Sequence, residues 1–329
     1  MSFTKVSPGV YRVSNIDVAV VNSLRRIILA EIPNLAFDVA DIRVLKNTGC
    51  LNNEFLSHRL SLVPICFDPE KDMPDILGYR FVMNLKNDTD EIMNVTSQHI
   101  QVFDGDTPVD QSIRDRLFPK NPMTGDSILI TKLMPNPYST AFCQEIELEM
   151  KATLNIAKTH ARWCPVSKCS YMNVIDEEAA AEARKTAENK KLFDVHGKYR
   201  YYKKNEFEMY IKSECAMTED YLLKKAVDIL MGHCERYLEK SEIKETVNSM
   251  FEMTIPDEDF TLVNLLQSFI YNQEIGKALD YIGYYQPHPL EKKMVLKMRF
   301  AEAMSVQEVK DFMALQNTRI CNMLTGLGI

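Results

Sequence analysis

The chain has 329 residues, 46% of them hydrophobic, which suits one large globular domain or two to three smaller ones and argues against disorder. Its 39 Lys and Arg against 46 Asp and Glu give a formal charge of −7. This acidity argues against unaided binding to a nucleic-acid backbone, which depends on clustered cations. No apolar run approaches the ~20 residues that span a bilayer, and the first residues lack a secretory signal.

The first elements are a strand, a helix and a second strand. Residues 10–13 alternate as a strand does. A helix is predicted over 21–32, with Asp17 as a candidate N-cap and Pro33 ending it. Residues 36–44 alternate again and predict one half-buried strand. The apolar residues of the helix recur every three or four positions: Val21, Leu24, Ile28 and Ile32.

Residues 66–140 change character and predict a separate β-rich insertion domain, with bounds 48–144. Prolines recur through this stretch, and Asp-Gly and Thr-Gly pairs mark turns. Strands are expected at 79–85 and 127–133. Alternation resumes at 143–154, which predicts a return to the first domain.

The segment 176–191 is rich in Ala, Glu and Lys, with acids early and bases late. This polarity fits a helix macrodipole, and the composition fits a solvated excursion equally well, so the path of 176–205 stays open. A strand at 206–213 and a helix over 218–239 follow. The helix carries apolar residues that include Leu223, Val227 and Leu230 at alternating steps of three and four, which is typical of a helix that packs on another helix.

The charged segment 241–248 shows little periodicity and is predicted to be a linker. After it, a strand at 250–255, a helix over 261–272, a strand at 294–300 and a helix over 305–327 are expected. The apolar faces of the two helices are Leu262, Leu265, Leu266, Phe269 and Ile270, and Val309, Met313 and Ile320.

The pattern of residues 21–28, VNxLxxxI, recurs at 263–270. Each copy comes before a strand. Together with the two C-terminal packing helices, the repeat indicates two related halves that bury one face against each other, as the partners of a dimer do.

Residues 22–33 (NSLRRIILAEIP) resemble the first helix of the α-like subunits of cellular RNA polymerases. Residues 51–65 (LNNEFLSHRLSLVPI) resemble a signature shared by the archaeal D-type protein and the third-largest subunit of RNA polymerase II. Residues 157–166 (AKTHARWCPV) are similar to a later stretch of the same proteins.

The C-terminal segment resembles a different polymerase component, the archaeal L-type protein and its RNA polymerase II counterpart. Its marks are 260–266 (FTLVNLL), 281–284 (YIGY) and 287–291 (PHPLE). Cellular polymerases encode these partners as two chains, whereas a fused arrangement resembles that of nucleocytoplasmic large DNA viruses. Phe260, Val263 and Gln267 replace the family's His, Gly and Arg, which weakens any expectation of polar contacts from this helix.

A metal site is the less favoured interpretation of the cysteines and His160. The eight cysteines are expected to be reduced thiols. His160, Cys164 and Cys169 offer three candidate ligands, whereas structural zinc usually takes four, so Cys143 would have to supply the last. The zinc loop or iron–sulfur module of some relatives is not expected either, since the stretch after Pro64 has only Cys66. We predict no metal and no cofactor.

The candidate functional residues are surface groups for assembly. Arg25 and Arg26 could form a solvated helix face, but the resemblance implies that this helix docks on a large polymerase subunit, where a guanidinium pairs well with carboxylates or carbonyls. Glu54 and His58 are spaced to share a helical face, yet no nucleophile or substrate pocket accompanies them. The predicted docking residues are Asn22, Arg25, Arg26, Glu54, His58, Arg59, His160 and Trp163.

The sequence thus predicts an α+β protein, an α-subunit-type dimerisation fold that forms a pseudo-heterodimer within one chain. The predicted domains are a D-like one (1–47 and 145–240), the insertion (48–144), the linker (241–248) and an L-like one (249–329). The expected interface residues are Val21, Leu24, Ile28, Leu223, Val227, Leu230, Leu262, Leu265, Leu266, Phe269, Val309, Met313 and Ile320.

The expected function is that of a non-catalytic platform for the two largest subunits of a DNA-directed RNA polymerase. Small zinc-ribbon-type subunits are further expected partners, DNA is contacted only through the complex, and no membrane is involved. A viral protein would act in the virion and host cytoplasm, and a cellular one in the nucleus. The alternatives are a free-standing scaffold of the same fold and a thiol- or metal-dependent enzyme around Cys164.

Overall fold

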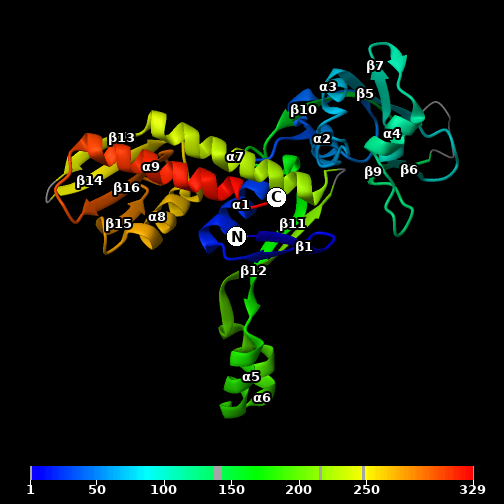
Figure 1. Cartoon of the computed structure of the whole chain (residues 1–329). Coiled ribbons are helices and arrows are strands. Elements are labelled where there is room, and N and C mark those ends of the chain that lie inside the picture. The colour runs from blue at the N-terminus through cyan, green and yellow to red at the C-terminus, as the bar shows by residue number, and fades with distance from the viewer. Residues whose placement is uncertain (1, 136–142, 215–216, 247–248, 329) are drawn as a thin grey trace. The chain divides into compact units, whose positions relative to one another are not determined.

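The computed structural model describes residues 2–135, 143–214, 217–246 and 249–328. They divide into two compact units (Figure 1). Unit 1 consists of Met1–Leu29, Lys168–Lys212 and Glu219–Ile329, and unit 2 consists of Ala30–Ser167 and Ser213–Thr218. Within the described ranges, no helix is both long enough and apolar enough to cross a membrane.

Unit 1 holds two four-stranded sheets, in the orders β1-β2-β12-β11 and β13-β14-β16-β15. Its strands are β1 (Ser2–Ser7), β2 (Val10–Ser14), β11 (Val166–Ile175), β12 (Tyr202–Ser213), β13 (Glu242–Thr246), β14 (Met250–Pro256), β15 (Leu279–Tyr285) and β16 (Lys293–Phe300). Its helices are α1 (Val18–Ala30), α5 (Glu177–Thr186), α6 (Lys190–Val195), the 3-10 helix η5 (Gly197–Arg200), α7 (Glu219–Lys240), α8 (Phe260–Glu274) and α9 (Val306–Thr325).

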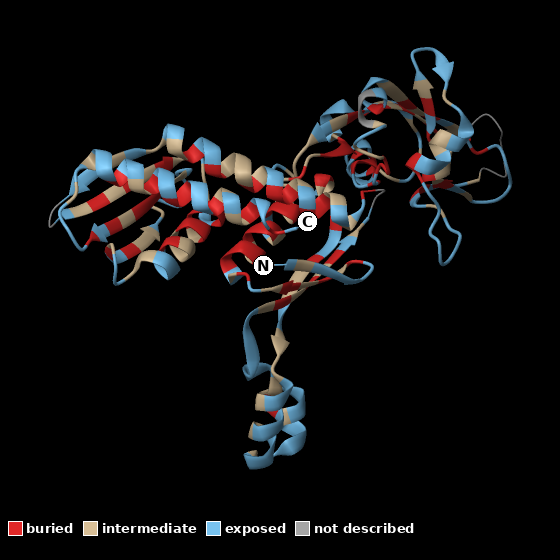
Figure 2. Ribbon diagram, in the orientation of Figure 1, coloured by how far each residue is buried: buried red, intermediate tan, exposed pale blue. Residues whose placement is uncertain are grey.

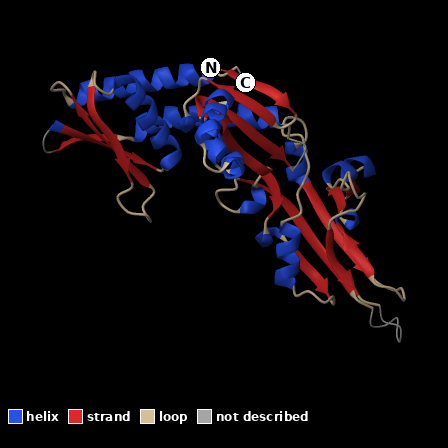
Figure 3. Cartoon of the chain, turned by 90° about the horizontal axis from the view of Figure 1, so that it is seen from below, coloured by secondary structure: helices blue, strands red, loops and turns tan. Residues whose placement is uncertain are grey.

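Helices cover one face of the sheet β13-β14-β16-β15 (Figure 3). Alternate residues of β14, namely Phe251, Met253 and Ile255, are buried. Buried positions, in red, recur along the strands of this sheet in Figure 2. Local signals start the helices. Asp259 accepts a hydrogen bond from the Thr261 backbone, and Ser305 forms a capping box at the start of α9.

Unit 2 is built on a sheet in the order β3-β10-β5-β7-β8, in which β4 also pairs with β10, and on a β6-β9 ribbon. Phe37, Phe81 and Phe118 form its aromatic core, with ring centroids 5.0–6.3 Å apart. Its strands are β3 (Asn34–Phe37), β4 (Arg43–Asn47), β5 (Tyr79–Lys86), β6 (Met93–Thr96), β7 (Gln101–Asp104), β8 (Thr107–Pro108), β9 (Leu129–Leu133) and β10 (Glu145–Asn155). Its helices are η1 (Val39–Asp41), α2 (Asn53–Ser61), α3 (Met73–Gly78), η2 (Ser97–His99), α4 (Gln111–Leu117) and η4 (Ala161–Trp163).

The α+β fold class is confirmed, and the four predicted packing helices are present as α1, α7, α8 and α9. The predicted strand 36–44 is wrong. It is divided into β3, η1 and β4, because the Asp38 carboxylate accepts a hydrogen bond from the Ala40 backbone and starts a 3-10 turn.

The compact units divide the chain differently from the predicted domains. The expected insertion shares a sheet with β3, β4 and β10, because β5 pairs along β10. The expected linker contains β13, which pairs with β14, although Val247 and Asn248 lie outside the described residues. The open segment 176–205 forms α5, α6 and η5 between β11 and β12.

Candidate functional site

Helices α1 and α8, which belong to the two halves of the sequence repeat, contact each other through polar side chains at both ends. Ser23 Oγ donates to the Thr261 carbonyl at 3.0 Å, and Arg26 Nε donates to Thr261 Oγ1 at 2.8 Å. At the other end, the Asp17 carboxylate accepts from Ser268 Oγ and from Asn272 Nδ2, each at 3.0 Å. The start of α1 therefore meets the end of α8, so the two helices run antiparallel.

The same contact occurs twice with the roles of the halves exchanged. The repeat places each residue of α1 242 positions before its counterpart in α8, so Asp17 corresponds to Asp259 and Arg26 to Ser268. Asp17 contacts Ser268, and Asp259 lies 3.9 Å from the Arg26 guanidinium. This exchange is what a twofold axis between two similar halves produces.

Helices α7 and α9 form a second antiparallel pair. Thr325 Oγ1 donates to Met231 Sδ at 3.8 Å, and the Cys234 thiol of α7 lies beside the Cys321 thiol of α9. Burial between the helices raises the pKa of the Cys234 thiol, which keeps it protonated and unreactive. The Glu274 carboxylate ties α8 to α9 by accepting hydrogen bonds from two α9 side chains, Gln316 and Arg319.

The structure buries twelve of the thirteen predicted interface residues and leaves Phe269 partly exposed. All lie on the four helices that form these contacts. Burial shows that they belong to the core of unit 1, and their role as an interface stays a prediction. The buried set is Val21, Leu24, Ile28, Leu223, Val227, Leu230, Leu262, Leu265, Leu266, Val309, Met313 and Ile320.

The two predicted docking arginines of α1 differ in their surroundings. Arg26 is occupied by Thr261 and Asp259 within unit 1. Arg25 makes a local hydrogen bond to Asn22 Oδ1 at 3.1 Å and is partly exposed. Of the two, Arg26 is the more exposed, with 43% of its side chain accessible, and Arg25 is the one whose hydrogen bond stays within its own helix.

Helix α2 positions three further predicted residues. Asn52 caps it by accepting from the Phe55 backbone. Glu54 and His58 are exposed on its surface. Arg59 donates to the Ile130 and Leu129 carbonyls of the β9 segment at 2.7 and 3.0 Å, so its guanidinium holds α2 on the ribbon.

The last two predicted residues, His160 and Trp163, flank a residue that sequence analysis missed, Arg162. The indole of Trp163 is 2% exposed and donates to the Thr153 carbonyl at 3.0 Å. Arg162 lies 5.2 Å from the indole centroid and donates to His160 Nδ1 at 3.1 Å. It also pairs with Asp38 at 3.3 Å. The four side chains fix this loop inside unit 2, and Trp163 presents no surface.

Sequence analysis also missed Ser23, Thr261 and Ser268, which form hydrogen bonds between the α1 and α8 segments. A signal was available for the first of them. Ser23 lies within the apolar face of its helix and is 2% exposed. A buried hydroxyl needs a hydrogen-bond partner, which here is a carbonyl 238 residues away.

The N-terminal hairpin is anchored to the start of α7 by one carboxylate. Asp220 accepts from Lys5 Nζ at 2.7 Å and from the Tyr11 hydroxyl at 2.6 Å. The hydrogen bonds from Lys5 and Tyr11 lower the pKa of Asp220. Burial, reinforced by Asp220, raises the pKa of Tyr11.

The Tyr11 contact predicts a loss of stability at alkaline pH. Unfolded Tyr titrates near pH ~10. Above that pH the unfolded chain releases a proton that folded Tyr11 retains, so the free energy of unfolding falls by up to about 1.4 kcal/mol per pH unit until the folded pKa is reached. We expect Tyr11→Phe to flatten the fall in the urea midpoint between pH 9.5 and 11. The exposed Tyr271→Phe is the control, and equal slopes for both variants would contradict the expectation.

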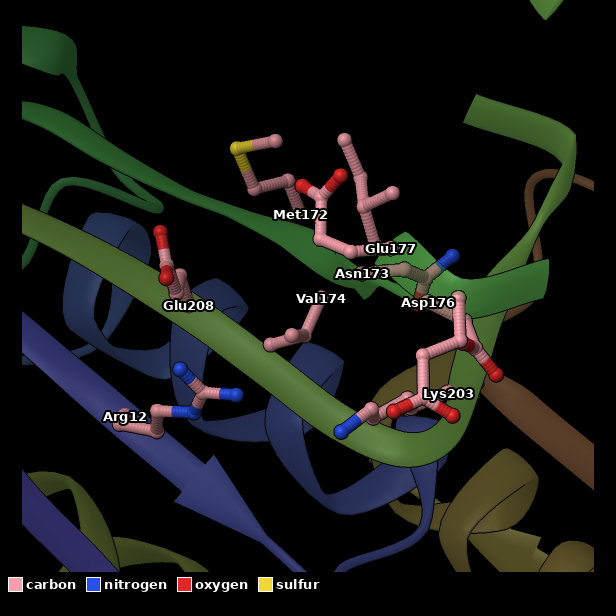
Figure 4. A pocket seen from close by; sticks show the side chains of 10 residues that line it. Arg12, Met172, Asn173, Val174, Asp176, Glu177, Lys203 and Glu208 are labelled. Carbon is pink, nitrogen blue, oxygen red and sulfur yellow. The ribbon is translucent and has the colours of Figure 1, made fainter. Parts of the chain in front are cut away.

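The described residues contain no group of three or more His, Cys, Asp or Glu side chains arranged to hold a metal ion. His160 Nδ1 accepts hydrogen bonds from Arg162, and Cys164 Sγ donates to the Val166 carbonyl. A cavity of about 530 Å³ in unit 1 is lined by residues that include Arg12, Asp176, Lys203 and Glu208 (Figure 4). No Ser, Cys or His lines it, so this cavity offers no nucleophile–base pair.

Comparison with known proteins gives two matches to one family, described as the RNA polymerase Rpb3/Rpb11 dimerisation domain, over residues 12–234 and 250–317. The chain is 30% identical over 171 residues to the DNA-directed RNA polymerases II, IV and V subunit 3 of Arabidopsis thaliana, covering 47% of this chain and 50% of that protein.

Two further relatives extend this likeness. DNA-directed RNA polymerase II subunit RPB3 of Schizosaccharomyces pombe is 33% identical over 168 residues, covering 48% of this chain and 53% of that protein. The RPAC1 subunit of DNA-directed RNA polymerases I and III of Mus musculus is 27% identical over 286 residues, covering 70% and 80%. The chain spans about half the length of the two subunit 3 proteins and four fifths of RPAC1.

Proposed function

Because the chain belongs to the RNA polymerase Rpb3/Rpb11 dimerisation family, we propose that it is a non-catalytic assembly subunit of a multisubunit DNA-directed RNA polymerase. One observation carries the proposal: two dimerisation domains lie in one chain, and their helices α1 and α8 contact each other antiparallel with exchanged roles. Each chain thus supplies both partners of a dimer.

The mechanism is to present one preassembled platform to the two largest polymerase subunits. Fusion keeps the halves at an effective concentration of roughly millimolar or above, so the platform forms without a bimolecular search. Catalysis then belongs to the large subunits, and small zinc-ribbon-type subunits are further proposed partners. The chain as a whole is acidic, so we propose that the DNA duplex reaches it through the complex.

We assign the docking contacts to two patches. The first, on α1, consists of Asn22 and Arg25, and the second, on α2, of Glu54 and His58, all at least partly exposed. The other predicted docking residues make contacts within the fold, although Arg26 and Arg59 are also exposed. Arg26 joins α1 to α8, and Arg59, His160 and Trp163 fix loops of unit 2.

The fused arrangement also supports a proposed origin. Since the family's cellular members divide these domains between two chains, we propose that this chain comes from a nucleocytoplasmic large DNA virus. It would then be packaged in the virion and act in the host cytoplasm. A cellular origin would place it in the nucleus.

Co-purification tests the assembly role. Changing Arg25 alone to Glu is the clean variant, because Arg26→Glu would bring a carboxylate beside Asp259 and disturb the helix contact. We expect Arg25→Glu to reduce recovery of the two largest subunits at least about tenfold, which corresponds to ~1.4 kcal/mol of lost interface energy. Recovery is measured by quantitative mass spectrometry of tagged chain from producing cells.

The matched control is Lys224→Glu, a charge reversal at an exposed residue of α7. It should leave recovery unchanged. Full recovery with Arg25→Glu would contradict the assigned contact. A wild-type chain that brings down no polymerase subunits would contradict the assembly role itself and favour a free-standing scaffold.

A further inference from the structure

Residues 190–204, which we call the basic tip, reverse the charge of the chain. They contain Lys190, Lys191, Lys198, Arg200, Lys203 and Lys204 against a single acid, Asp194. The formal charge of these 15 residues is therefore +5 in a chain whose total is −7. The whole folded element, residues 176–204, also includes the acids of α5 and has a formal charge of +2. An excess of cations within one short stretch of an acidic protein is typical of a site for a polyanion.

The basic tip is held in a defined fold at the end of strands β11 and β12 (Figure 1). Arg184 of α5 donates two hydrogen bonds to the Asp194 carboxylate, at 2.6 and 2.8 Å, and so joins α5 to α6. The Asp176 backbone donates to the Tyr201 carbonyl at 3.0 Å and closes the base. Phe193 and Tyr201 pack with ring centroids 5.9 Å apart. The cations are thus presented on a small folded element.

The one acid of the basic tip is already neutralised from outside the tip. Asp194 pairs with Arg184, and the pKa of Asp194 is lowered by that hydrogen bond. Lys190, Lys191 and Arg200 are exposed and form no ion pair within the described ranges. Their charges are available to an external anion.

Aromatic side chains alternate with these cations. Tyr199 is 52% exposed and Tyr202 is 48% exposed. Lys198 Nζ lies 5.2 Å from the centroid of the Tyr199 ring, on one face of it. An exposed phenol ring among cations offers its free face to a nucleic-acid base for stacking, while the cationic groups bind the adjacent phosphates. Stacking requires bases that are unpaired.

From the unpaired cations and the exposed rings between them, we propose that the basic tip binds single-stranded nucleic acid. This goes beyond the assembly role and does not depend on it, because the contact belongs to one element of the chain. An acidic protein surface would satisfy the cations but would leave the tyrosine rings without a specific partner, so the nucleic acid is the better fit.

The test measures binding of the full chain to a fluorescent 20-nucleotide single strand by anisotropy across a salt series. The tip variant is Lys190→Gln, Lys191→Gln and Arg200→Gln together. The matched control is Lys224→Gln, Lys292→Gln and Lys310→Gln, three exposed lysines without ion pairs in the described structure. Circular dichroism checks that each variant folds.

We expect the tip variant to bind about tenfold more weakly at moderate salt. The slope of log K against log salt should flatten by about two, since each lost phosphate contact on a single strand contributes ~0.7. A second variant, Tyr199→Ser with Tyr202→Ser, should weaken binding about fivefold per unstacked base with an unchanged slope. The control should match the wild type.

Three results would overturn the proposal. Equal affinity and slope for the tip variant and the control would show that the tip holds no phosphates. Duplex DNA bound as tightly as the single strand would exclude stacking. The third result is displacement of the fluorescent strand by poly-glutamate at the same charge concentration at which unlabelled single strand displaces it. That result would show that the basic tip is a general site for acidic partners. None of these results bears on co-purification with polymerase subunits, so the assembly role is tested separately.

Discussion

Replacing Trp163 with alanine is expected to destabilise unit 2 by about 3–5 kcal/mol, the usual cost of truncating a buried large aromatic side chain. The indole is 2% exposed, donates to the Thr153 carbonyl and lies under the Arg162 guanidinium. Its removal opens a cavity, leaves that carbonyl without its donor and frees the guanidinium that joins Asp38 to His160. The free energy of unfolding, measured by urea denaturation with circular dichroism, checks the value.

A second substitution retains part of the packing and removes the hydrogen bond. Trp163→Phe retains a six-membered aromatic ring but loses the indole N–H and part of the ring volume, so a cost of about 2–3 kcal/mol, below that of Trp163→Ala, is expected. Phe55→Ala, on an exposed side chain of α2, is the control and should cost less than about 0.5 kcal/mol. A Trp163→Ala variant as stable as this control would mean that the indole is not buried in solution and could face a partner after all.

Truncating Leu24 to alanine is expected to cost about 2–5 kcal/mol in unit 1. Leu24 is 0% exposed and follows Ser23, whose hydroxyl binds the Thr261 carbonyl of α8. A cavity beside this contact removes apolar packing where the two halves of the chain meet. The measurement is the urea midpoint at constant m-value, which separates lost stability from a changed unfolded state.

Leu315 provides the matched control for Leu24. It has the same side chain in another helix of unit 1, α9, but is 51% exposed. Leu315→Ala should change the free energy of unfolding by no more than about 0.5 kcal/mol. If Leu24→Ala and Leu315→Ala lower the free energy of unfolding by the same amount, Leu24 is not buried in solution.

The helices of this fold were predictable because each buries one face. Val21, Leu24 and Ile28 repeat at steps that only a helix places on one side, and the structure buries all three. The strand at 36–44 was wrongly predicted because a single local hydrogen bond from Asp38 interrupts it. The strand at 242–246 gave no apolar alternation, since Ile243 is its one apolar residue and the other four side chains, three of them charged, are exposed, while the backbone pairs with β14.

The sequence allowed several residues of the candidate site to be identified, but not the residues that each of them contacts. The arginine pair of α1 was identified, yet periodicity could not tell which guanidinium faces Thr261, a residue 235 positions later. Resemblance likewise identified Trp163 without indicating that its ring lies inside. Polar contacts between distant segments depend on the packed geometry, and that geometry is not encoded in any local pattern.

The two corresponding contacts, of Asp17 with Ser268 and of Asp259 with Arg26, lie within one polypeptide. A single round of translation therefore delivers both halves in a ratio of one to one. Neither half is ever made as an orphan that would need a chaperone or be degraded, and separate promoters need not be balanced. Supply of the platform is then limited by one messenger alone.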